Sequence, residues 1–175
     1  VASLVGSEMC IRDSFMSLLL LGWAVGAPFS GWLSDHIGRR KPILVTGLVV
    51  ICIMLAVFAG ISDLPLGAVV ACLVVIGLSG GGMTACFGLV KDVMPAPLAG
   101  ASTGVVNSMT VASGAILQPF VGLALDLQWD GRLVDGARHY AEGDYRTAFT
   151  LVLVAAVIGL VTALSLRETP RGHAP

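Results

Sequence analysis

The sequence predicts an all-α membrane protein with five transmembrane helices. Only 12% of the 175 residues are charged and 56% are hydrophobic, whereas a soluble domain carries about 25% charged residues. The charged residues separate long uncharged runs, and each run is long enough to cross a hydrocarbon layer of about 30 Å as a helix. In LVVICIMLAVFAG (residues 48–60) apolar side chains occupy every face, unlike the alternation of a β-barrel strand.

Residues 1–14 precede the first uncharged run and show no clear period. They include EMCIRD (residues 8–13), which resembles the in-frame translation of a transposase-type sequencing adapter. We therefore interpret residues 1–14 as a cloning or assembly scar and leave them out of the fold prediction. A genuine polar N-terminal segment is the alternative interpretation.

Charged residues and prolines set the expected ends of the five helices. The first run ends at Asp35, and the second starts at Pro42, a residue favoured in the first turn of a helix. The third ends before Lys91, the fourth ends before Asp126, and the fifth follows Arg146. The predicted spans are residues 15–34, 42–62, 65–90, 98–125 and 147–166, in a membrane region at 15–167 that is followed by a tail at 168–175.

The connections between the spans fall into a basic set and an acidic set. The first set contains six basic residues: Arg39, Arg40, Lys41, Lys91, Arg167 and Arg171. The second set combines three arginines with six acids: Arg132, Arg138, Arg146, Asp63, Asp126, Asp130, Asp135, Glu142 and Asp144. Because cytoplasmic segments are enriched in Lys and Arg, we expect the first set and the tail in the cytoplasm, and the protein in the lipid bilayer of a bacterial inner (plasma) membrane. A net charge of −1 gives no sign of a nucleic-acid partner.

Residues 31–42, GWLSDHIGRRKP, form the most charged stretch and lie between the first two spans. The Asp35 carboxylate at a helix end can meet the free N–H groups and positive dipole of a neighbouring helix. The following arginines can hold it in a bidentate pair, while Gly31 allows close helix approach and Gly38 a tight turn. Such a cluster would hold two helical units together on one membrane face and release them when the units rock. A plain cytoplasmic turn with positive-inside charges is the alternative.

GWLSDHIGRR resembles the signature loop of the major facilitator superfamily, G-x-x-x-D-(R/K)-x-G-R-(R/K). It matches at five positions: Gly31, Asp35, Gly38, Arg39 and Arg40. It departs at His36, where the family has Arg or Lys and where a histidine is charged only at mildly acidic pH. The resemblance implies that these six residues form a gating motif.

The resemblance also implies a partial fold. In this family two six-helix halves make twelve helices, and the signature loop follows the second helix of each half. Here one span precedes the loop and four follow, which fits helices 2–6 or 8–12. The third span lacks the intramembrane arginine often found in helix four, and the chain stops shortly after its fifth span. We therefore expect helices 8–12 of 12, a C-terminal-half fragment whose partner is the missing N-terminal helical half of the same protein.

Small residues are expected to bring the helices close together. In the third span Gly77 and Gly81 form a small-xxx-small pair. In the fourth span four small residues recur every four positions: Gly100, Gly104, Ser108 and Ala112. Both patterns predict tight packing, with or without sliding of the helices during transport.

Asn107 and Gln118 in the fourth span are the candidate substrate-binding residues. They lie eleven residues apart, near one face of a helix that Pro119 is expected to kink. Amides at membrane depth tend to face the protein interior or a wet cavity. Hydrogen bonding between helices is the alternative role.

The sequence and the resemblance predict secondary active or facilitative transport of a small solute by alternating access. The implied solutes include sugar phosphates, amino acids, peptides, organic anions and drugs, and nothing selects among them. The alternatives are a solute sensor of the same family that does not transport, and a structural multi-pass membrane protein. No ionisable residue lies deep in a span, and no catalytic motif, cofactor motif or metal-ligand spacing of Cys or His is present. We therefore predict that the chain is not an enzyme and has no cofactor or metal.

Overall fold

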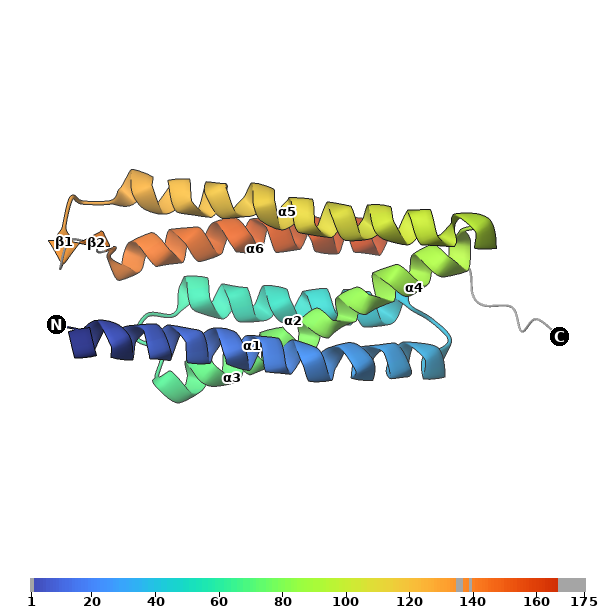
Figure 1. The fold of residues 1–175 in the computed structure, drawn as a ribbon, viewed down its shortest axis with the longest axis horizontal. Helices are drawn as coiled ribbons and strands as arrows, with labels where there is room; N and C mark the ends of the chain where they lie inside the picture. The colour runs from blue at the N-terminus through green and yellow to red at the C-terminus, as the bar shows by residue number, and fades with distance from the viewer. Residues whose placement is uncertain (1, 135–136, 139, 167–175) are drawn as a thin grey trace.

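The computed structural model describes residues 2–134, 137–138 and 140–166. Its elements follow one another as an antiparallel helical bundle (Figure 1). In chain order they are α1 (Ala2–Ile37), α2 (Lys41–Gly60), α3 (Leu66–Gly80), the 3₁₀ turn η1 (Gly81–Met83), α4 (Thr84–Val93), the 3₁₀ turn η2 (Ala96–Leu98), α5 (Ala99–Gln128), the strands β1 (Leu133–Val134) and β2 (Ala137–Arg138), and α6 (Glu142–Ser165).

The five predicted spans are confirmed, with shifted ends. Within the described residues, five helical segments are long and apolar enough to cross a membrane: Asp13–Ile37, Lys41–Gly60, Leu66–Val93, Ala96–Gln128 and Gly143–Ser165. The first ends at Ile37 rather than at residue 34, because Gly38 terminates the helix. Gly38 has φ of 70° and its N–H donates to Ser34 O at 3.0 Å, a left-handed helix end that glycine favours. Asp35 thus ends the uncharged run, whereas α1 continues to Ile37.

Two other segments differ from the sequence prediction. α1 begins at Ala2 and runs through the segment interpreted as a scar, whose origin the fold does not test. The connection before the last span contains a two-residue antiparallel hairpin, with Leu133 opposite Arg138 and Val134 opposite Ala137. The predicted tail at 168–175 lies outside the described residues.

Glycines let α1 and α3 cross at backbone contact, as predicted for Gly77 and Gly81. A Cβ added to Gly81 would overlap the backbone of Gly26 and Ala27, and one added to Gly77 would overlap Leu19 O. Reciprocally, a Cβ on Gly22 would lie 2.9 Å from Val74 O. Pairs of glycines spaced by four on both helices therefore interlock, and no larger residue fits there.

The third span changes direction at its glycine run. Between α3 and α4, residues Gly81–Met83 form a 3₁₀ turn rather than α-helix. The chain then crosses the bundle diagonally, from α1 toward α5 (Figure 1). This path places α4 against both α1 and α2 and brings its last turn to the charged loop after α1.

The stripe of Gly100, Gly104, Ser108 and Ala112 is not packed against any described helix. A Cβ added to Gly100, Gly104 or Gly114 would meet nothing within 4 Å. Among the described elements, α5 packs mainly along α6 and the end of α4, and none of its residues is buried. The tight packing predicted for this stripe is therefore absent from the described part of the chain.

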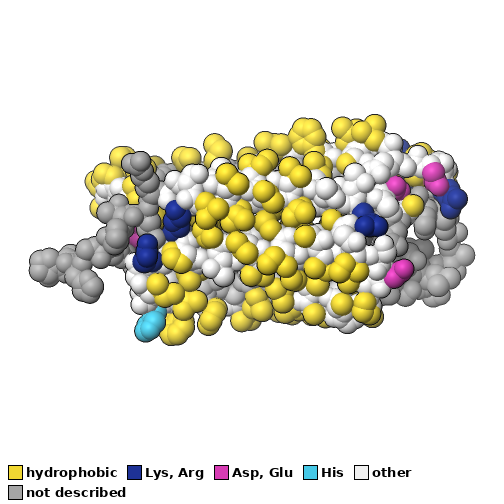
Figure 2. All heavy atoms as spheres, turned by 180° about the vertical axis from the view of Figure 1, so that it is seen from behind, with side chains coloured by type: hydrophobic (Ala, Val, Ile, Leu, Met, Phe, Trp, Pro, Cys, Tyr) yellow, Lys and Arg dark blue, Asp and Glu magenta, His cyan; other side chains and the backbone are white. Residues whose placement is uncertain are grey.

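Apolar side chains cover the sides of the bundle, and charged side chains gather at its two ends (Figure 2). The buried hydrophobic cluster is small: Leu44 of α2, Ala85 of α4 and Ala163 of α6, with Val45, Leu48 and Cys86 packed against it. A surface of this kind suits a lipid environment, in which exposed Leu, Val and Phe carry no penalty.

Candidate functional site

The predicted gating motif lies at one end of the bundle, which we call the basic end. It comprises the α1–α2 turn, the last turn of α4 and the end of α6. Hydrogen bonds of Arg40 and Lys41 to α4 and α6 bring these segments together. The described residues of these segments include four basic residues, Arg39, Arg40, Lys41 and Lys91, and two acidic residues, Asp35 and Asp92.

Arg40 is the centre of this end. Its Nε lies 2.6 Å from the Asp92 carboxylate on α4, and its Nη2 lies 3.3 Å from the Asp35 carboxylate on α1. The Arg40 side chain is 14% exposed, that of Asp92 is 25% exposed and that of Asp35 is 62% exposed. One guanidinium therefore joins two helices that are far apart in the sequence, and the stronger contact is the more buried one.

Gly88 makes room for this guanidinium. A Cβ added to Gly88 of α4 would overlap the Arg40 guanidinium atoms. The planar group therefore lies directly on the α4 backbone, one turn before Asp92. A lysine ammonium could not reproduce this arrangement, because it has neither the planar shape nor the fork of donors.

The other motif residues lie at the end of α1 and in the turn after it. Gly38 forms the turn, and His36 stacks on Trp32 with ring centroids 5.6 Å apart. Arg39 is exposed on the turn. A Cβ added to Gly31 would meet nothing within 4 Å, so the close helix approach predicted at that glycine is not made by the described residues.

Ser34 is the most buried side chain beside the motif. It is 1% exposed, and its hydroxyl has no hydrogen-bond partner among the described residues. A buried hydroxyl without a partner costs free energy relative to a methyl group of similar size. The Ser34 hydroxyl is therefore a buried polar group to which the described residues offer no hydrogen bond.

Lys41 and Arg146 fasten α2 to α6 at opposite ends. Lys41, the first residue of α2, donates to Leu164 O at 2.6 Å and to Leu166 O at 2.7 Å at the end of α6. Arg146, in the first turns of α6, donates to Ala59 O at 2.9 Å and to Gly60 O at 3.1 Å at the end of α2. Each cation thus satisfies free carbonyls and the negative dipole end of the antiparallel neighbour.

A cavity of about 490 Å³ lies beside the α1–α2 turn. Ile37 and Pro42 flank the turn and line the cavity, and Ser30, Thr46 and Ser79 contribute hydroxyls deeper in. The turn therefore has free space on its inner side.

Asn107 and Gln118 are both exposed on α5. Eleven residues at 1.5 Å per residue separate them by about 16 Å along the helix, so they cannot contact one small solute together. Neither residue belongs to the basic end, and neither forms a hydrogen bond with another of the described residues.

The opposite end of the bundle, which we call the hairpin end, carries a second polar cluster. The Asp126 carboxylate accepts hydrogen bonds from Arg138 at 2.6 Å and from the Tyr140 hydroxyl at 2.7 Å, and the Arg138 guanidinium lies 4.8 Å from the centre of the Trp129 ring. The hydrogen bond to Asp126 raises the pKa of Tyr140 and the pKa of Arg138. The hairpin is thereby tied to the end of α5.

Sequence reasoning missed Asp92, the contact of Gly88 with Arg40, and the acceptors of Lys41. Asp92 follows Lys91 in the connection after the third span. Its position at the end of that span, on the same face of the membrane as the motif, was the available signal. The backbone carbonyls of Leu164 and Leu166 carry no sequence signal, since any residue supplies the same acceptor.

The comparisons with known proteins agree with this architecture. The chain is 31% identical over 103 residues to a protein named probable metabolite transport protein CsbC of Bacillus subtilis, covering 58% of this chain and 22% of that protein. It is 24% identical over 168 residues to inositol transporter 4 of Arabidopsis thaliana, covering 95% of this chain and 26% of that protein, and 25% identical over 163 residues to the probable inositol transporter 2 of the same plant, covering 92% and 25%. No solved structure matches.

The chain spans about a quarter of the length of these relatives. A sequence model of the Major Facilitator Superfamily matches residues 11–175, which include all five membrane-spanning helices and the charged turn. The chain is therefore a multi-pass membrane segment that belongs to the Major Facilitator Superfamily.

Proposed function

We propose that the protein containing this chain is a secondary active or facilitative transporter that moves a small solute by alternating access. The observation that carries the proposal is the Arg40 bridge, which joins the signature turn to Asp92 on a different helix. In such a mechanism two helical units rock around a central site. The bridge holds the signature turn in place at one membrane face, where the turn would meet the other unit when that face is closed.

Five of the six motif residues take separate parts in this gate. Arg40 and Asp35 supply the bridge, and Gly38 supplies the turn that presents them. Arg39 adds positive charge at the face of the membrane that the positive-inside rule favours as cytoplasmic, and the His36 ring stacks on Trp32 at the same end. The cavity behind Ile37 and Pro42 gives the turn room to change position when the bridge opens.

The chain corresponds in this proposal to helices 8–12 of a twelve-helix transporter. The exposed face of α5, with Asn107 and Gln118, supports this assignment. Amides facing hydrocarbon are costly, so the face would lie against the N-terminal helical half or against a watery path between the halves. Asn107 and Gln118 would contact the solute at different depths of that path. The location would be a bacterial inner (plasma) membrane.

The relatives favour an uncharged hydroxylated solute. Several are named as inositol transporters, and the described membrane-depth residues supply amide and hydroxyl groups rather than charges. Amides can both donate and accept hydrogen bonds, which suits a polyol. A solute sensor without transport is the second candidate, because binding alone would use the same groups.

Asp35→Asn in the full-length protein tests the gate. We expect the level of folded protein in the membrane to stay near that of the wild type, because Asp35 is largely exposed. We expect uptake of the transported solute to fall several-fold. Normal uptake by Asp35→Asn would remove the support for a gating role.

A further inference from the structure

The cavity of about 490 Å³ beside the signature turn has a hydroxyl on each of its three walls. Ser30 comes from α1, Thr46 from α2 and Ser79 from α3. The other described residues that line the cavity are apolar or glycine, and none of them is ionisable. The polar chemistry of the cavity is therefore that of three uncharged groups, each of which can both donate and accept a hydrogen bond.

The protein's own packing does not use these hydroxyls. None of the three forms a hydrogen bond with another of the described residues, and Ser30 is only 9% exposed. Most hydroxyls elsewhere in the spans behave differently, for instance those of Thr84 and Thr110, which donate to carbonyls three and four residues earlier. Because a buried hydroxyl without a partner is costly, the three unused groups call for an occupant that forms hydrogen bonds.

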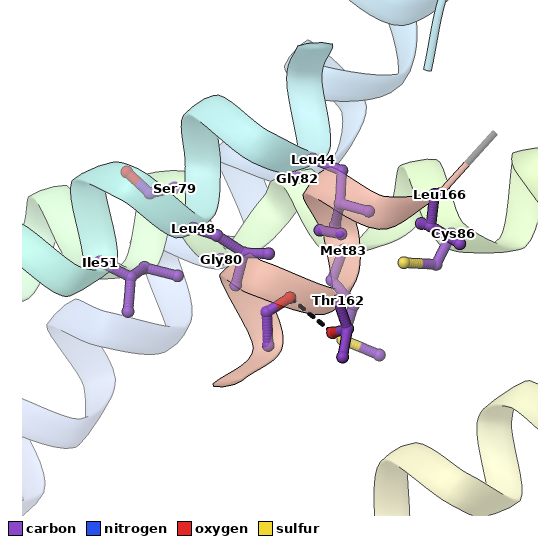
Figure 3. A pocket seen from close by; sticks show the side chains of 12 residues that line it. Leu44, Leu48, Ile51, Ser79, Gly80, Gly82, Met83, Cys86, Thr162 and Leu166 are labelled. Atoms are coloured by element: carbon purple, nitrogen blue, oxygen red, sulfur yellow. Dashed lines mark hydrogen bonds between the residues drawn. The ribbon is translucent and has the colours of Figure 1, made fainter. Parts of the chain in front are cut away.

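A neighbouring cavity lacks this feature. It measures about 440 Å³ and lies between α2, α6 and the η1–α4 segment (Figure 3). Ser79 borders this cavity as well, but its other hydroxyl, that of Thr162, donates to Gly159 O at 2.7 Å (Figure 3). The unused hydroxyls of Ser30 and Thr46 therefore distinguish the cavity beside the signature turn.

The hydroxyls of that cavity lie within reach of water from the basic end. Ile37 and Pro42 flank the charged turn and line the cavity. Thr46 is four residues from Pro42, and Ser30 is seven residues from Ile37, which correspond to about 6 and 10 Å along their helices. The polar interface that flanks the hydrocarbon core is itself about 5–7 Å thick on each side, so the cavity begins in the interface and extends slightly beyond it.

Water matches this cavity better than a lipid chain does. A lipid chain would leave all three hydroxyls without a partner, whereas water donates and accepts as they do. A water molecule occupies about 30 Å³ in the liquid and forms about three hydrogen bonds when buried, so the cavity has room for a cluster. We propose that this cavity is a water site, in which water from the basic end bridges Ser30, Thr46 and Ser79.

The water site gives the inner side of the signature turn a mobile hydrogen-bonding partner. Water can rearrange when the turn changes position, so the hydroxyls keep partners in both positions. This role in the gate rests on the proposed function, whereas the presence of water does not. The two can fail separately, because water is detected without measuring transport.

Thiol labelling of the full-length protein, with its own cysteines replaced, tests the site. Ser30→Cys is nearly isosteric, and Val49→Cys is the control. Val49 lies seven residues from Pro42, the same distance along its helix as Ser30 from Ile37, and it is 37% exposed without lining the cavity. A charged methanethiosulfonate reagent is applied to both sides of proteoliposomes. We expect Ser30→Cys to react at least about tenfold faster, because the reactive thiolate is unstable in hydrocarbon.

Thr46→Val in the Ser30→Cys protein removes one hydroxyl at nearly constant shape. We expect it to slow the labelling several-fold, because the water loses one of its partners. If Ser30→Cys does not fold, Thr46→Cys against Val49→Cys decides, since Thr46 lines the cavity from the same helix.

Three results would overturn the water site. Equally slow labelling at the cavity position and at position 49 would mean that a lipid chain or another helix fills the cavity. Equally fast labelling would mean that water is not confined to it. A rate unchanged by Thr46→Val would show that the hydroxyls do not hold the water.

Discussion

The Arg40 Nε atom lies 2.6 Å from the Asp92 carboxylate, across 52 residues of sequence. This contact joins the signature turn to the last turn of α4, while the same guanidinium reaches Asp35 at 3.3 Å. The signature turn and the end of α1 therefore supply only part of the ion-pair cluster, namely Asp35 and Arg40. The other part comes from a helix that the glycine run at Gly81–Met83 directs across the bundle.

The Arg40–Asp92 pair is expected to couple strongly in a double-mutant cycle. Both side chains are largely shielded from solvent, so the pair is less screened than a surface ion pair. We expect Arg40→Gln and Asp92→Asn to be non-additive by on the order of 1–3 kcal/mol in the free energy of unfolding. The free energies of unfolding of the wild type, the two single variants and the double variant are measured by reversible unfolding in mixed detergent and SDS micelles.

The exposed pair Arg132–Asp130, at 2.9 Å on the hairpin end, is the matched control. Its coupling is expected to be at most about 1 kcal/mol, as for surface pairs in general. Equal coupling energies in the two cycles would contradict the central position given to Arg40.

The glycine contact between α1 and α3 is expected to tolerate no side chain. Because a Cβ on Gly81 would overlap the backbone of Gly26, Gly81→Ala should destabilise the protein by about 1–3 kcal/mol. Gly104→Ala introduces the same methyl group into open space on α5 and should be neutral or slightly stabilising, since alanine is the better helix former. The midpoint of unfolding of the 175-residue chain in detergent checks both, and a larger loss for Gly104→Ala would refute the described packing.

Ser34→Ala is expected to stabilise the protein. The substitution removes a buried hydroxyl that has no partner among the described residues, and it leaves a methyl-sized group in the same space. The gain should be about 1 kcal/mol in the free energy of unfolding. A loss of stability would show that the hydroxyl has a partner supplied from outside the described residues.

Tyr140 is expected to ionise above its ordinary range in the folded protein. Its neutral hydroxyl donates to the Asp126 carboxylate, and this bond raises the pKa of Tyr140. The bond therefore contributes to stability below about pH 10, the pKa of an unfolded tyrosine, and the contribution is lost as the pH rises through the higher folded pKa. The chain has two tyrosines, so an ultraviolet titration of Tyr140→Phe against the wild type isolates this group. The component that disappears should titrate above about pH 10, and a component at or below that value would argue against the bond.

Features that depend on one segment of the chain could be predicted from the sequence, whereas features that depend on how the helices pack could not. The apolar runs predicted all five spans because membrane insertion depends on continuous hydrophobicity, which a single segment displays. The first helix continues to Ile37, beyond the uncharged run that defined the first expected span, because Gly38 decides where the backbone turns. The interlocking of Gly77 and Gly81 with α1 was half predicted, since the spacing shows a packing face but not which helix meets it.

The candidate site was less predictable than the fold. The motif located the turn and its arginines, but no spacing rule connects Arg40 to a residue 52 positions away. The acceptors of Lys41 are backbone carbonyls at the end of α6, which only the packing of α2 on α6 brings within reach. The stripe of small residues on α5 looked like an internal packing face, yet no described helix packs against its glycines.

Solute counterflow in proteoliposomes tests the central claim most directly. The full-length protein would be loaded with unlabelled solute on the inside, and uptake of labelled solute would be followed for a panel that includes myo-inositol, sugars, amino acids and organic anions. A transporter with alternating access should take up at least one labelled solute faster when the same solute is present on the far side, and Asp35→Asn should slow that exchange. Saturable binding of a solute with no exchange of any member of the panel would contradict transport and identify the protein as a sensor.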